Sequence, residues 1–286
     1  MTIIETINRA AARLSAHKVD NARRDAELLL CHVLGRDRAW LLAHIQDGID
    51  DQSLRQYERV IDRRAVREPA QYIIGRQEFR GLPFKVNADV LIPRPETEFV
   101  VEAALKAVSM AVAPVILDLC TGSGCIAISL AKELLKAQVF ATDRSEQALG
   151  VAHENARMNQ VADRIRFLAG DLFAPIEELD LHEKVDVITA NPPYIRAGDL
   201  AALQPEVRDF EPEMALIAGP EGTEIGAAII QQAPPFLKQG GALIMEMGLG
   251  QTAAFSGIIN NTGNYRSLEI VKDLAGIERV LIARKA

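Results

Sequence analysis

The sequence has only three cysteines, Cys31, Cys120 and Cys125, and they follow no recognisable spacing. Disulfide frameworks and zinc sites depend on paired cysteines, so an odd number without such pairing predicts neither of them. No signal-peptide pattern precedes them. We therefore expect a protein of the reducing cytoplasm that binds no metal.

The sequence also lacks long hydrophobic runs. A helix that crosses a bilayer needs roughly 18 or more apolar residues without charges. The most apolar stretch, residues 103–120, is interrupted by Lys106, Ser109 and Asp118. We therefore expect a soluble chain with no membrane partner.

Basic residues are also fewer than acidic residues. The chain has 32 Lys and Arg against 39 Asp and Glu, which gives a net charge of −7. Residues 1–75 hold 12 basic and 11 acidic side chains and residues 76–286 hold 20 and 28, so the acidic surplus lies in the second part. This balance excludes bulk attraction to phosphate as the main source of affinity. We expect no stable complex with nucleic acid.

The remaining composition, 49% hydrophobic and 25% charged residues, is that of a globular protein, and 286 residues correspond to about two domains. Between residues 3 and 67 the apolar positions recur at helical spacing, which predicts four or five short helices. Asp20 or Asn21 can begin the second helix, Gly35 can end it, and Pro69 follows the last one. We assign residues 1–72 to a small helical bundle domain.

A change of pattern follows the helical part. Short β-like runs at residues 78–80 and 84–86 flank a turn at Gly81, and a further run at residues 90–92 precedes Pro93. Such runs around a Gly-Pro turn predict a hairpin. We assign residues 73–95 to a β-hairpin linker between two domains.

Strands and helices alternate from residue 96 to the end of the chain. The continuous apolar runs at residues 115–117, 139–141 and 185–188 are typical of strands that are buried on both faces. Alternation of this kind predicts an α/β fold with a mostly parallel sheet between two layers of helices. Residues 96–286 therefore form the second predicted domain.

A glycine-containing turn follows the first strand of this domain. Its residues are Cys120, Thr121, Gly122, Ser123 and Gly124, and an apolar helix begins directly after them. Glycine lets a ligand approach the backbone at the carboxyl end of a parallel strand, where open α/β sheets bind ligands. The turn alone is equally compatible with a tight connection that binds nothing.

The next strands also end in polar residues. Asp143 ends the second strand, 25 positions after Asp118, where a carboxylate can accept hydrogen bonds from a ribose diol. Asp171 and Leu172 follow the third strand, and Asn191 follows the fourth. We expect all four strands to deliver these side chains to one edge of the sheet.

The most informative motif is Asn191-Pro192-Pro193-Tyr194. The prolines fix the backbone and lack N–H donors, so the Asn191 side-chain oxygen and the Pro192 carbonyl remain as acceptors. Two acceptors suit one NH₂ group, and the Tyr194 ring can stack on a flat amide or aromatic amine. An Asn-Pro turn alone is common in surface loops, but its place after a ligand-type glycine turn favours an amine-binding site.

Together these motifs resemble the S-adenosylmethionine-dependent methyltransferases of the Rossmann-like class that act on NH₂ groups. Within that group the chain is similar to the PrmC/HemK family, the N5-glutamine methyltransferases of peptide chain release factors. The resemblance covers almost the whole chain, and it includes residues 75–79, 91–98, 120–124, 191–194 and 210–216. It implies the class I fold with a seven-stranded sheet, an N-terminal helical domain that recognises the substrate, and methylation of the glutamine in a Gly-Gly-Gln motif.

The resemblance also implies the site residues. S-Adenosyl-L-methionine, which becomes S-adenosyl-L-homocysteine, would contact Asp118, Cys120, Thr121, Gly122, Ser123, Gly124, Asp143, Asp171, Leu172 and Asn191. The substrate amide would contact Asn191, Pro192, Pro193 and Tyr194, of which Asn191, Pro192 and Tyr194 are the catalytic candidates. Cys120 stands where the family turn has its first glycine, and Leu172 stands where some members carry an aromatic residue. We expect release factors as protein partners and a monomeric enzyme.

Several alternatives stay open. An adenine-N6 methyltransferase of DNA or RNA would use the same acceptor pair, although it should carry a basic groove. A ribosomal-protein glutamine methyltransferase shares the chemistry, but the run Arg94-Pro95-Glu96-Thr97-Glu98 favours the release-factor type. A non-catalytic binding module is disfavoured because both ligand motifs are intact. Glu98, Glu211 and Glu246 are interpreted as structural, and Arg94 as a candidate contact to the substrate.

Overall fold

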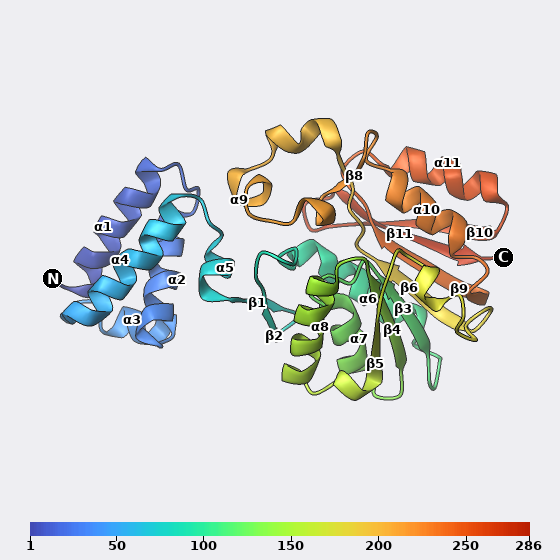
Figure 1. Ribbon diagram of the computed structural model, residues 1–286, viewed down its shortest axis with the longest axis horizontal. Helices are drawn as coiled ribbons and strands as arrows, with labels where there is room; N and C mark the ends of the chain where they lie inside the picture. Colours follow the sequence, from blue (N-terminus) through green and yellow to red (C-terminus); the bar gives the residue numbers. More distant parts are fainter. The chain divides into compact units, whose positions relative to one another are not determined.

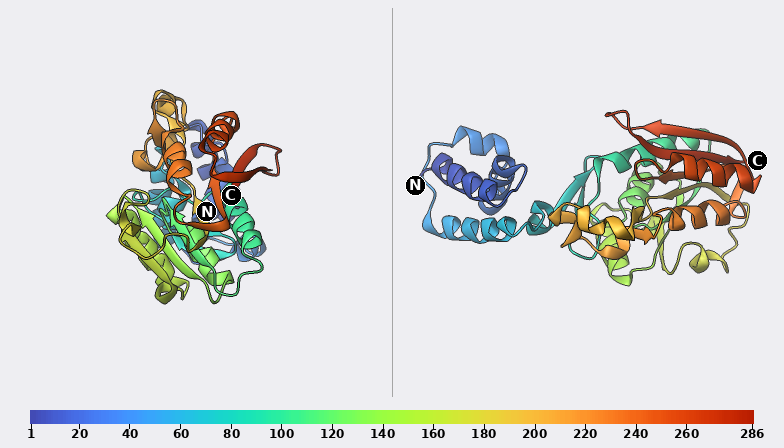
Figure 2. Two further views of the ribbon diagram at one scale, coloured as in Figure 1. Left: turned by 90° about the vertical axis from the view of Figure 1, so that its right-hand side faces the viewer. Right: turned by 90° about the horizontal axis from the view of Figure 1, so that it is seen from above.

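Five helices form the first part of the chain in the computed structural model, which describes residues 1–286. They are α1 (Ile3–Ala16), α2 (Ala22–Leu34), α3 (Arg38–Ala43), α4 (Asp51–Ala65) and α5 (Ala70–Ile74). Figures 1 and 2 show α1, α2 and α4 side by side. Their apolar faces meet in a core in which Ile7, Leu14, Leu29 and Leu30 are fully buried. The helical bundle predicted from periodicity is present.

The ends of these helices follow capping chemistry, with two differences from expectation. Asn21 begins α2, but its side chain makes no capping hydrogen bond. Gly35 ends α2 in the left-handed conformation, with φ of 62°, as predicted. Pro69 does not follow the last helix. It precedes α5, because a proline at a helix start loses no backbone hydrogen bond.

The chain divides into two compact units, and the helical unit includes a distant segment. It comprises Met1–Arg76 together with Gln204–Phe210, which contains the short helix α9 (Pro205–Arg208). Glu206 ties this segment to the bundle, because its carboxylate accepts hydrogen bonds from Arg64 at 2.8 Å and Arg67 at 2.5 Å. The assignment of domains to residues 1–72, 73–95 and 96–286 stays a prediction.

A short hairpin opens the chain's other unit, which comprises Gln77–Leu203 and Glu211–Ala286. Its strands are β1 (Arg76–Phe79) and β2 (Leu82–Lys85), joined at Gly81, so the hairpin prediction is confirmed. The third run, residues 90–92, lies in no strand. Val90 and Ile92 are buried there as part of a loop that leads into Pro93.

A sheet of seven strands forms the centre of this unit. In chain order they are β3 (Val115–Leu119), β4 (Gln138–Asp143), β5 (Ile165–Ala169), β6 (Val185–Ala190), β9 (Leu237–Glu246), β10 (Tyr265–Lys272) and β11 (Glu278–Lys285). Their spatial order is β10-β11-β9-β6-β3-β4-β5. β11 runs antiparallel to both of its neighbours, β9 and β10, and the other neighbouring strands are parallel. β10 and β11 form a hairpin at one edge (Figure 2). The predicted α/β class with a mostly parallel seven-stranded sheet is confirmed.

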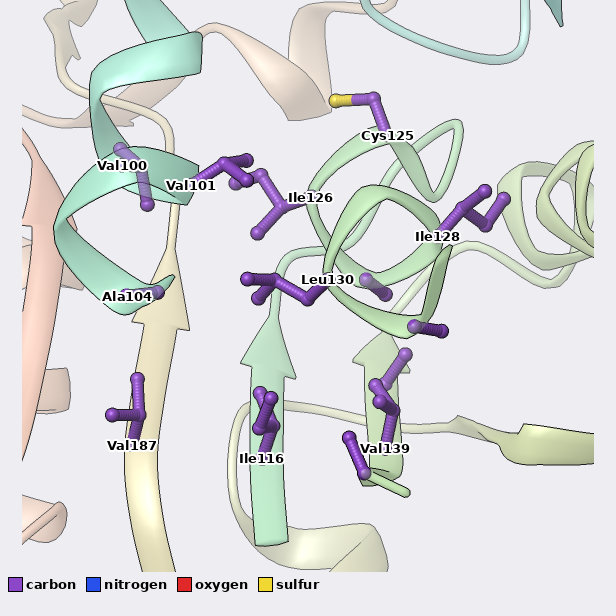
Figure 3. Close-up of a cluster of buried hydrophobic side chains, with 14 of the residues drawn as sticks. Val100, Val101, Ala104, Ile116, Cys125, Ile126, Ile128, Leu130, Val139 and Val187 are labelled. Atoms are coloured by element: carbon purple, nitrogen blue, oxygen red, sulfur yellow. The ribbon is translucent and has the colours of Figure 1, made fainter. Parts of the chain in front are cut away.

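Helices cover both faces of the sheet (Figure 1). They are α6 (Glu98–Ala107), α7 (Cys125–Glu133) and α8 (Glu146–Met158) on one face, and α10 (Glu224–Gln232) and α11 (Thr252–Thr262) on the other. Figure 3 shows side chains of α6 and α7 packed over Ile116, Val139 and Val187. The alternate residues Leu117 and Ile188 belong to the opposite core. Both faces of each central strand are therefore buried, which explains the continuous apolar runs.

Short elements complete this unit. They are β7 (Ile195–Arg196), β8 (Ile217–Gly219) and the 3₁₀ turns Pro95–Thr97, Ala162–Arg164, Ala174–Ile176, Ala197–Ala202 and Glu213–Ala215. β7 and β8 pair in parallel as a separate two-stranded sheet. None of the helices is both long enough and apolar enough to cross a bilayer.

Candidate functional site

A cavity of about 500 Å³ lies at the carboxyl ends of the central strands. Ligand cavities of this size hold small organic molecules. Of the residues predicted for the site, those that line it are Cys120, Thr121, Gly122, Ser123, Asp143, Asp171, Leu172, Asn191 and Pro193. Asp118, Gly124, Pro192 and Tyr194 do not line it. The structure thus brings together the ends of four strands that the sequence pattern selected.

The turn between β3 and α7 has a left-handed backbone at three of its residues. Cys120, Gly122 and Gly124 all have positive φ values, of 55°, 53° and 81°. For Cys120 this conformation is uncommon, and it explains why glycine is usual at such a position. At Gly124 a Cβ would lie only 2.9 Å from Cδ1 of Ile128, so a side chain there needs space that α7 occupies. The turn brings its backbone to the cavity wall.

Asp118 lies beneath this turn and not on the cavity wall. Its side chain is fully buried, and it accepts hydrogen bonds from the hydroxyls of Thr121 at 2.6 Å and Thr189 at 2.7 Å. Burial raises the pKa of Asp118 to about 7, although both hydroxyls stabilise the ionised form. Asp118 therefore holds the turn in place through Thr121.

Asp143 is the carboxylate that faces the cavity. One oxygen accepts the Gly122 amide at 2.8 Å and the other accepts the Ser145 amide at 2.9 Å. Each carboxylate oxygen has a second acceptor position, so a pair of hydroxyls from a ribose can still be bound. Burial raises the pKa of Asp143, while these backbone amides oppose the shift. These acceptors fit the ribose hydroxyls of a nucleoside.

Asp171 and Leu172 form another part of the wall. The Asp171 side chain is 65% exposed, and its nearest cation is Arg144 at 3.9 Å. Leu172 has a φ of 46° and is held by a hydrogen bond from the Thr142 hydroxyl to its carbonyl, at 3.0 Å. The Leu172 side chain is mostly buried, so it offers an apolar edge to a flat ring.

Asn191 directly follows β6 and lines the cavity. Its Nδ2 donates to the Thr97 hydroxyl at 3.1 Å, and that hydroxyl donates to Oε2 of Glu246 at 2.7 Å. Burial raises the pKa of Glu246 to about 7. Oδ1 of Asn191 accepts no hydrogen bond within the protein and is free for a ligand.

Tyr194, the last residue of the motif, is held by contacts with Gln251 and Gly248. Gln251 donates from Nε2 to the Tyr194 carbonyl at 2.9 Å and to the Gly222 carbonyl at 2.8 Å. A Cβ on Gly248 would lie 3.1 Å from the Tyr194 ring, so the ring packs closely on that backbone. Burial raises the pKa of Tyr194 to about 12, so its hydroxyl stays protonated at neutral pH.

Sequence reasoning missed several residues around the site. Thr97 lines the cavity and contacts Asn191, and Glu246 contacts Thr97. Arg94 donates to Glu211 at 2.6 Å, and Glu98 accepts the Arg80 amide at 3.0 Å. The interpretation of Glu98, Glu211 and Glu246 as structural did not foresee these partners. The motif at residues 91–98 contains Arg94, Thr97 and Glu98 and is the sequence signal for these contacts.

Two family models match the chain. The model described as the PrmC N-terminal domain matches residues 5–75, and the model described as the methyltransferase small domain matches residues 97–205. A release factor glutamine methyltransferase from Geobacter sulfurreducens is 40% identical over 99% of this chain and 96% of that protein. One from Cereibacter sphaeroides is 40% identical over 99% of both chains.

The chain belongs to the release factor glutamine methyltransferase family. The resemblance drawn from the motifs is confirmed, and membership makes the chain a methyltransferase. Among solved structures, the hMettl16 catalytic domain in complex with the MAT2A 3'UTR hairpin 6 has a TM-score of 0.60 at 18% identity, over 78% of this chain and 81% of that chain. A methyltransferase from Pyrococcus furiosus has a TM-score of 0.50 at 17% identity, over 73% and 91%. These likenesses support the methyltransferase fold of this family member.

Proposed function

We propose that this chain transfers a methyl group from S-adenosyl-L-methionine to the side-chain amide of the glutamine in the Gly-Gly-Gln motif of bacterial peptide chain release factors. The observation that carries the proposal is Asn191 on the cavity wall. Its Nδ2 is engaged by Thr97 and its Oδ1 is free, beside the glycine turn, in a chain that belongs to this family. A free acceptor at this place suits an incoming NH₂ group.

The wall residues fit S-adenosyl-L-methionine chemically. Asp143 would accept the ribose hydroxyls, Gly122 and Thr121 would lie along the amino-acid part, and Leu172 would border the adenine. When bound, this cofactor supplies a methyl group activated by a sulfonium charge, and it leaves as S-adenosyl-L-homocysteine. Asp118 would contribute by holding Thr121 in place.

The task of the protein at the substrate amide is orientation. An amide nitrogen is a poor nucleophile because its lone pair is delocalised into the carbonyl. Acceptors at Asn191 Oδ1 and at the Pro192 carbonyl would bind its two hydrogens and favour the positive charge that develops on nitrogen during attack. The nitrogen becomes acidic after methylation, so its proton can leave to water without a strong general base. Positioning of this kind can contribute several kcal/mol to catalysis.

The helical unit would serve recognition of the release factor. Its match to the PrmC N-terminal model covers residues 5–75, outside the methyltransferase domain match. A methyltransferase acting on a small amide needs no such addition, whereas a protein substrate offers further surface to bind. We propose that the enzyme acts as a monomer in the cytoplasm.

The test is methylation with labelled S-adenosyl-L-methionine, offered separately with a release factor, a ribosomal protein and DNA. The expected result is label in the release factor alone, and peptide mass spectrometry should place one methyl group on its Gly-Gly-Gln glutamine. The matched control is a release factor whose motif glutamine is replaced by asparagine. Label in DNA alone, or equal label in the control, would overturn the proposal.

A further inference from the structure

A chain of hydrogen bonds joins a buried carboxyl group to the cavity. Glu246, at the end of β9, is 2% exposed, and Thr97, at the start of α6, is 1% exposed. The Thr97 hydroxyl is 2.7 Å from Oε2 of Glu246 and 3.1 Å from Nδ2 of Asn191. Thr97 and Asn191 line the cavity, but Glu246 does not.

Which groups donate and which accept in these hydrogen bonds depends on the ionisation of Glu246. A carboxylate can only accept hydrogen bonds, so the single hydrogen of the Thr97 hydroxyl is donated to it. The hydroxyl oxygen can then only accept from its other neighbour, and that neighbour must be the NH₂ end of the Asn191 amide. Oδ1 of Asn191 is consequently left for the ligand.

A protonated Glu246 would allow the opposite arrangement. It can donate to the Thr97 oxygen, which frees the hydroxyl hydrogen for Asn191. Asn191 could then rotate its amide so that Oδ1 accepts from Thr97 and its NH₂ end turns to the ligand. Two NH₂ groups would face each other there, and both are donors, so the substrate amide would lose its acceptor.

We propose that Thr97 and Glu246 are positioning residues that hold the Asn191 side chain with Oδ1 toward the substrate NH₂ group, and that the carboxylate form of Glu246 fixes this orientation. The inference rests on the proposed function, since it assigns the orientation of the substrate-binding group of that same site. Neither residue touches the reacting atoms in this account. Their effect reaches the substrate through Asn191.

Several charged or titratable groups act on Glu246. They are Glu96, Arg94, Arg279, Tyr194 and Cys125. Glu96 disfavours the carboxylate and the two arginines favour it, while burial raises its pKa to about 7. Because the carboxylate form is the competent one, kcat should rise with pH through this value. The acid limb of the profile should therefore lie well above the ordinary pKa of a glutamate.

Three variants test the hydrogen-bond chain at saturating S-adenosyl-L-methionine and release factor. Thr97→Val keeps the shape of the side chain without its hydroxyl, and it should lower kcat by about 10- to 100-fold. Thr97→Ser keeps a hydroxyl and should recover most of the loss. Thr252→Val is the matched control, because Thr252 donates to Glu278 at 2.6 Å and lies outside the cavity wall, and it should leave kcat unchanged.

The pH profile separates positioning from a merely structural role. In Glu246→Gln the side chain no longer titrates, so the acid limb of kcat should disappear between about pH 5 and pH 9. Carbon-13 NMR of the free enzyme should show one glutamate carboxyl titrating near neutral pH, a signal absent from Glu246→Gln. An unchanged acid limb in this variant, or a fully active Thr97→Val, would overturn the inference.

The controls distinguish this inference from the proposed function. If wild-type enzyme labels DNA or ribosomal protein instead of the release factor, the proposed function fails, and the same variants test the hydrogen-bond chain with the accepted substrate. If wild-type enzyme labels the release factor and Thr97→Val does so at the same rate, only the positioning role fails. Thermal unfolding and the cofactor affinity measured by calorimetry show whether a variant lost kcat because it misfolded. If Thr97→Val misfolds, the kcat of Thr97→Ser decides the result.

Discussion

Replacement of Gly124 by alanine should destabilise the methyltransferase unit through two separate effects. Gly124 has a φ of 81°, in the left-handed region that residues with a Cβ rarely adopt. Its Cβ would also lie 2.9 Å from Cδ1 of Ile128 and 3.2 Å from Cβ of Ala152. Ala152 belongs to α8, so the added methyl group would push two helices apart.

The expected cost follows from these two effects. The left-handed conformation costs an alanine about 1 to 2 kcal/mol. Forcing a methyl group into a packed core costs about 1 to 3 kcal/mol more. Gly124→Ala should therefore lower the free energy of unfolding by about 2 to 5 kcal/mol, with the spread set by how far Ile128 can yield.

Gly122 provides the matched control within the same turn. Its φ of 53° is also left-handed, but a Cβ there would meet no atom within 4 Å. Gly122→Ala should carry the conformational cost alone, about 1 to 2 kcal/mol. The difference between the two variants isolates the packing contribution of α7 and α8.

Urea unfolding followed by circular dichroism measures both variants. Trp40, the only tryptophan, lies in the helical unit, so its fluorescence reports that unit separately and should not change with either substitution. A lower transition midpoint with an unchanged slope indicates lost stability. If Gly124→Ala is as stable as Gly122→Ala, the turn relaxes freely and the packing argument is wrong.

Three further predictions address the site and the helical unit. Asn191→Ala should lower kcat by about 100-fold or more with little change in cofactor affinity, as measured by single-turnover rates and calorimetry. Tyr57→Phe removes a buried hydroxyl 2.9 Å from the Ala26 carbonyl, and Trp40 fluorescence in urea should report a loss of about 1 kcal/mol. The third concerns Asp118, whose pKa is raised from 3.8 to about 7 in the folded protein, so stability should fall as pH rises across that interval. Asp118→Asn should reduce this decline in urea midpoints measured at pH 5 and pH 8, and parallel declines would refute the assignment.

The sheet was predictable because its strands are buried on both faces. Runs such as residues 115–117 and 139–141 leave no polar position for a solvent-exposed face, so helices on both sides were the only consistent arrangement. The run at residues 90–92 has the same composition but forms a buried loop. Pro93 and Pro95 deprive that region of the N–H donors that a strand needs.

The placement of site residues was predictable at strand ends and less so within the turn. Asp143 ends β4 and Asn191 follows β6, the two parallel strands on either side of β3, and both residues line the cavity as the parallel arrangement requires. The side chain of Asp118 points instead into the protein, where Thr121 and Thr189 bind it. Its direction depends on hydroxyls up to 71 positions away, which a linear pattern does not reveal.

The position of Glu246 beside Asn191 follows from the order of the strands in the sheet. β6 and β9 are parallel neighbours in which Ala190 pairs with Met245, so Asn191 and Glu246 are the next residues of adjacent strands. The apolar run before Glu246 is completely buried, and an acidic residue at its end is costly unless something binds it. The strand-end rule that selected Asn191 selects Glu246 as well once β9 is known to lie beside β6. The order of the strands depends on contacts between residues distant in sequence. It is needed to recognise that Glu246 lies beside the site and can position Asn191.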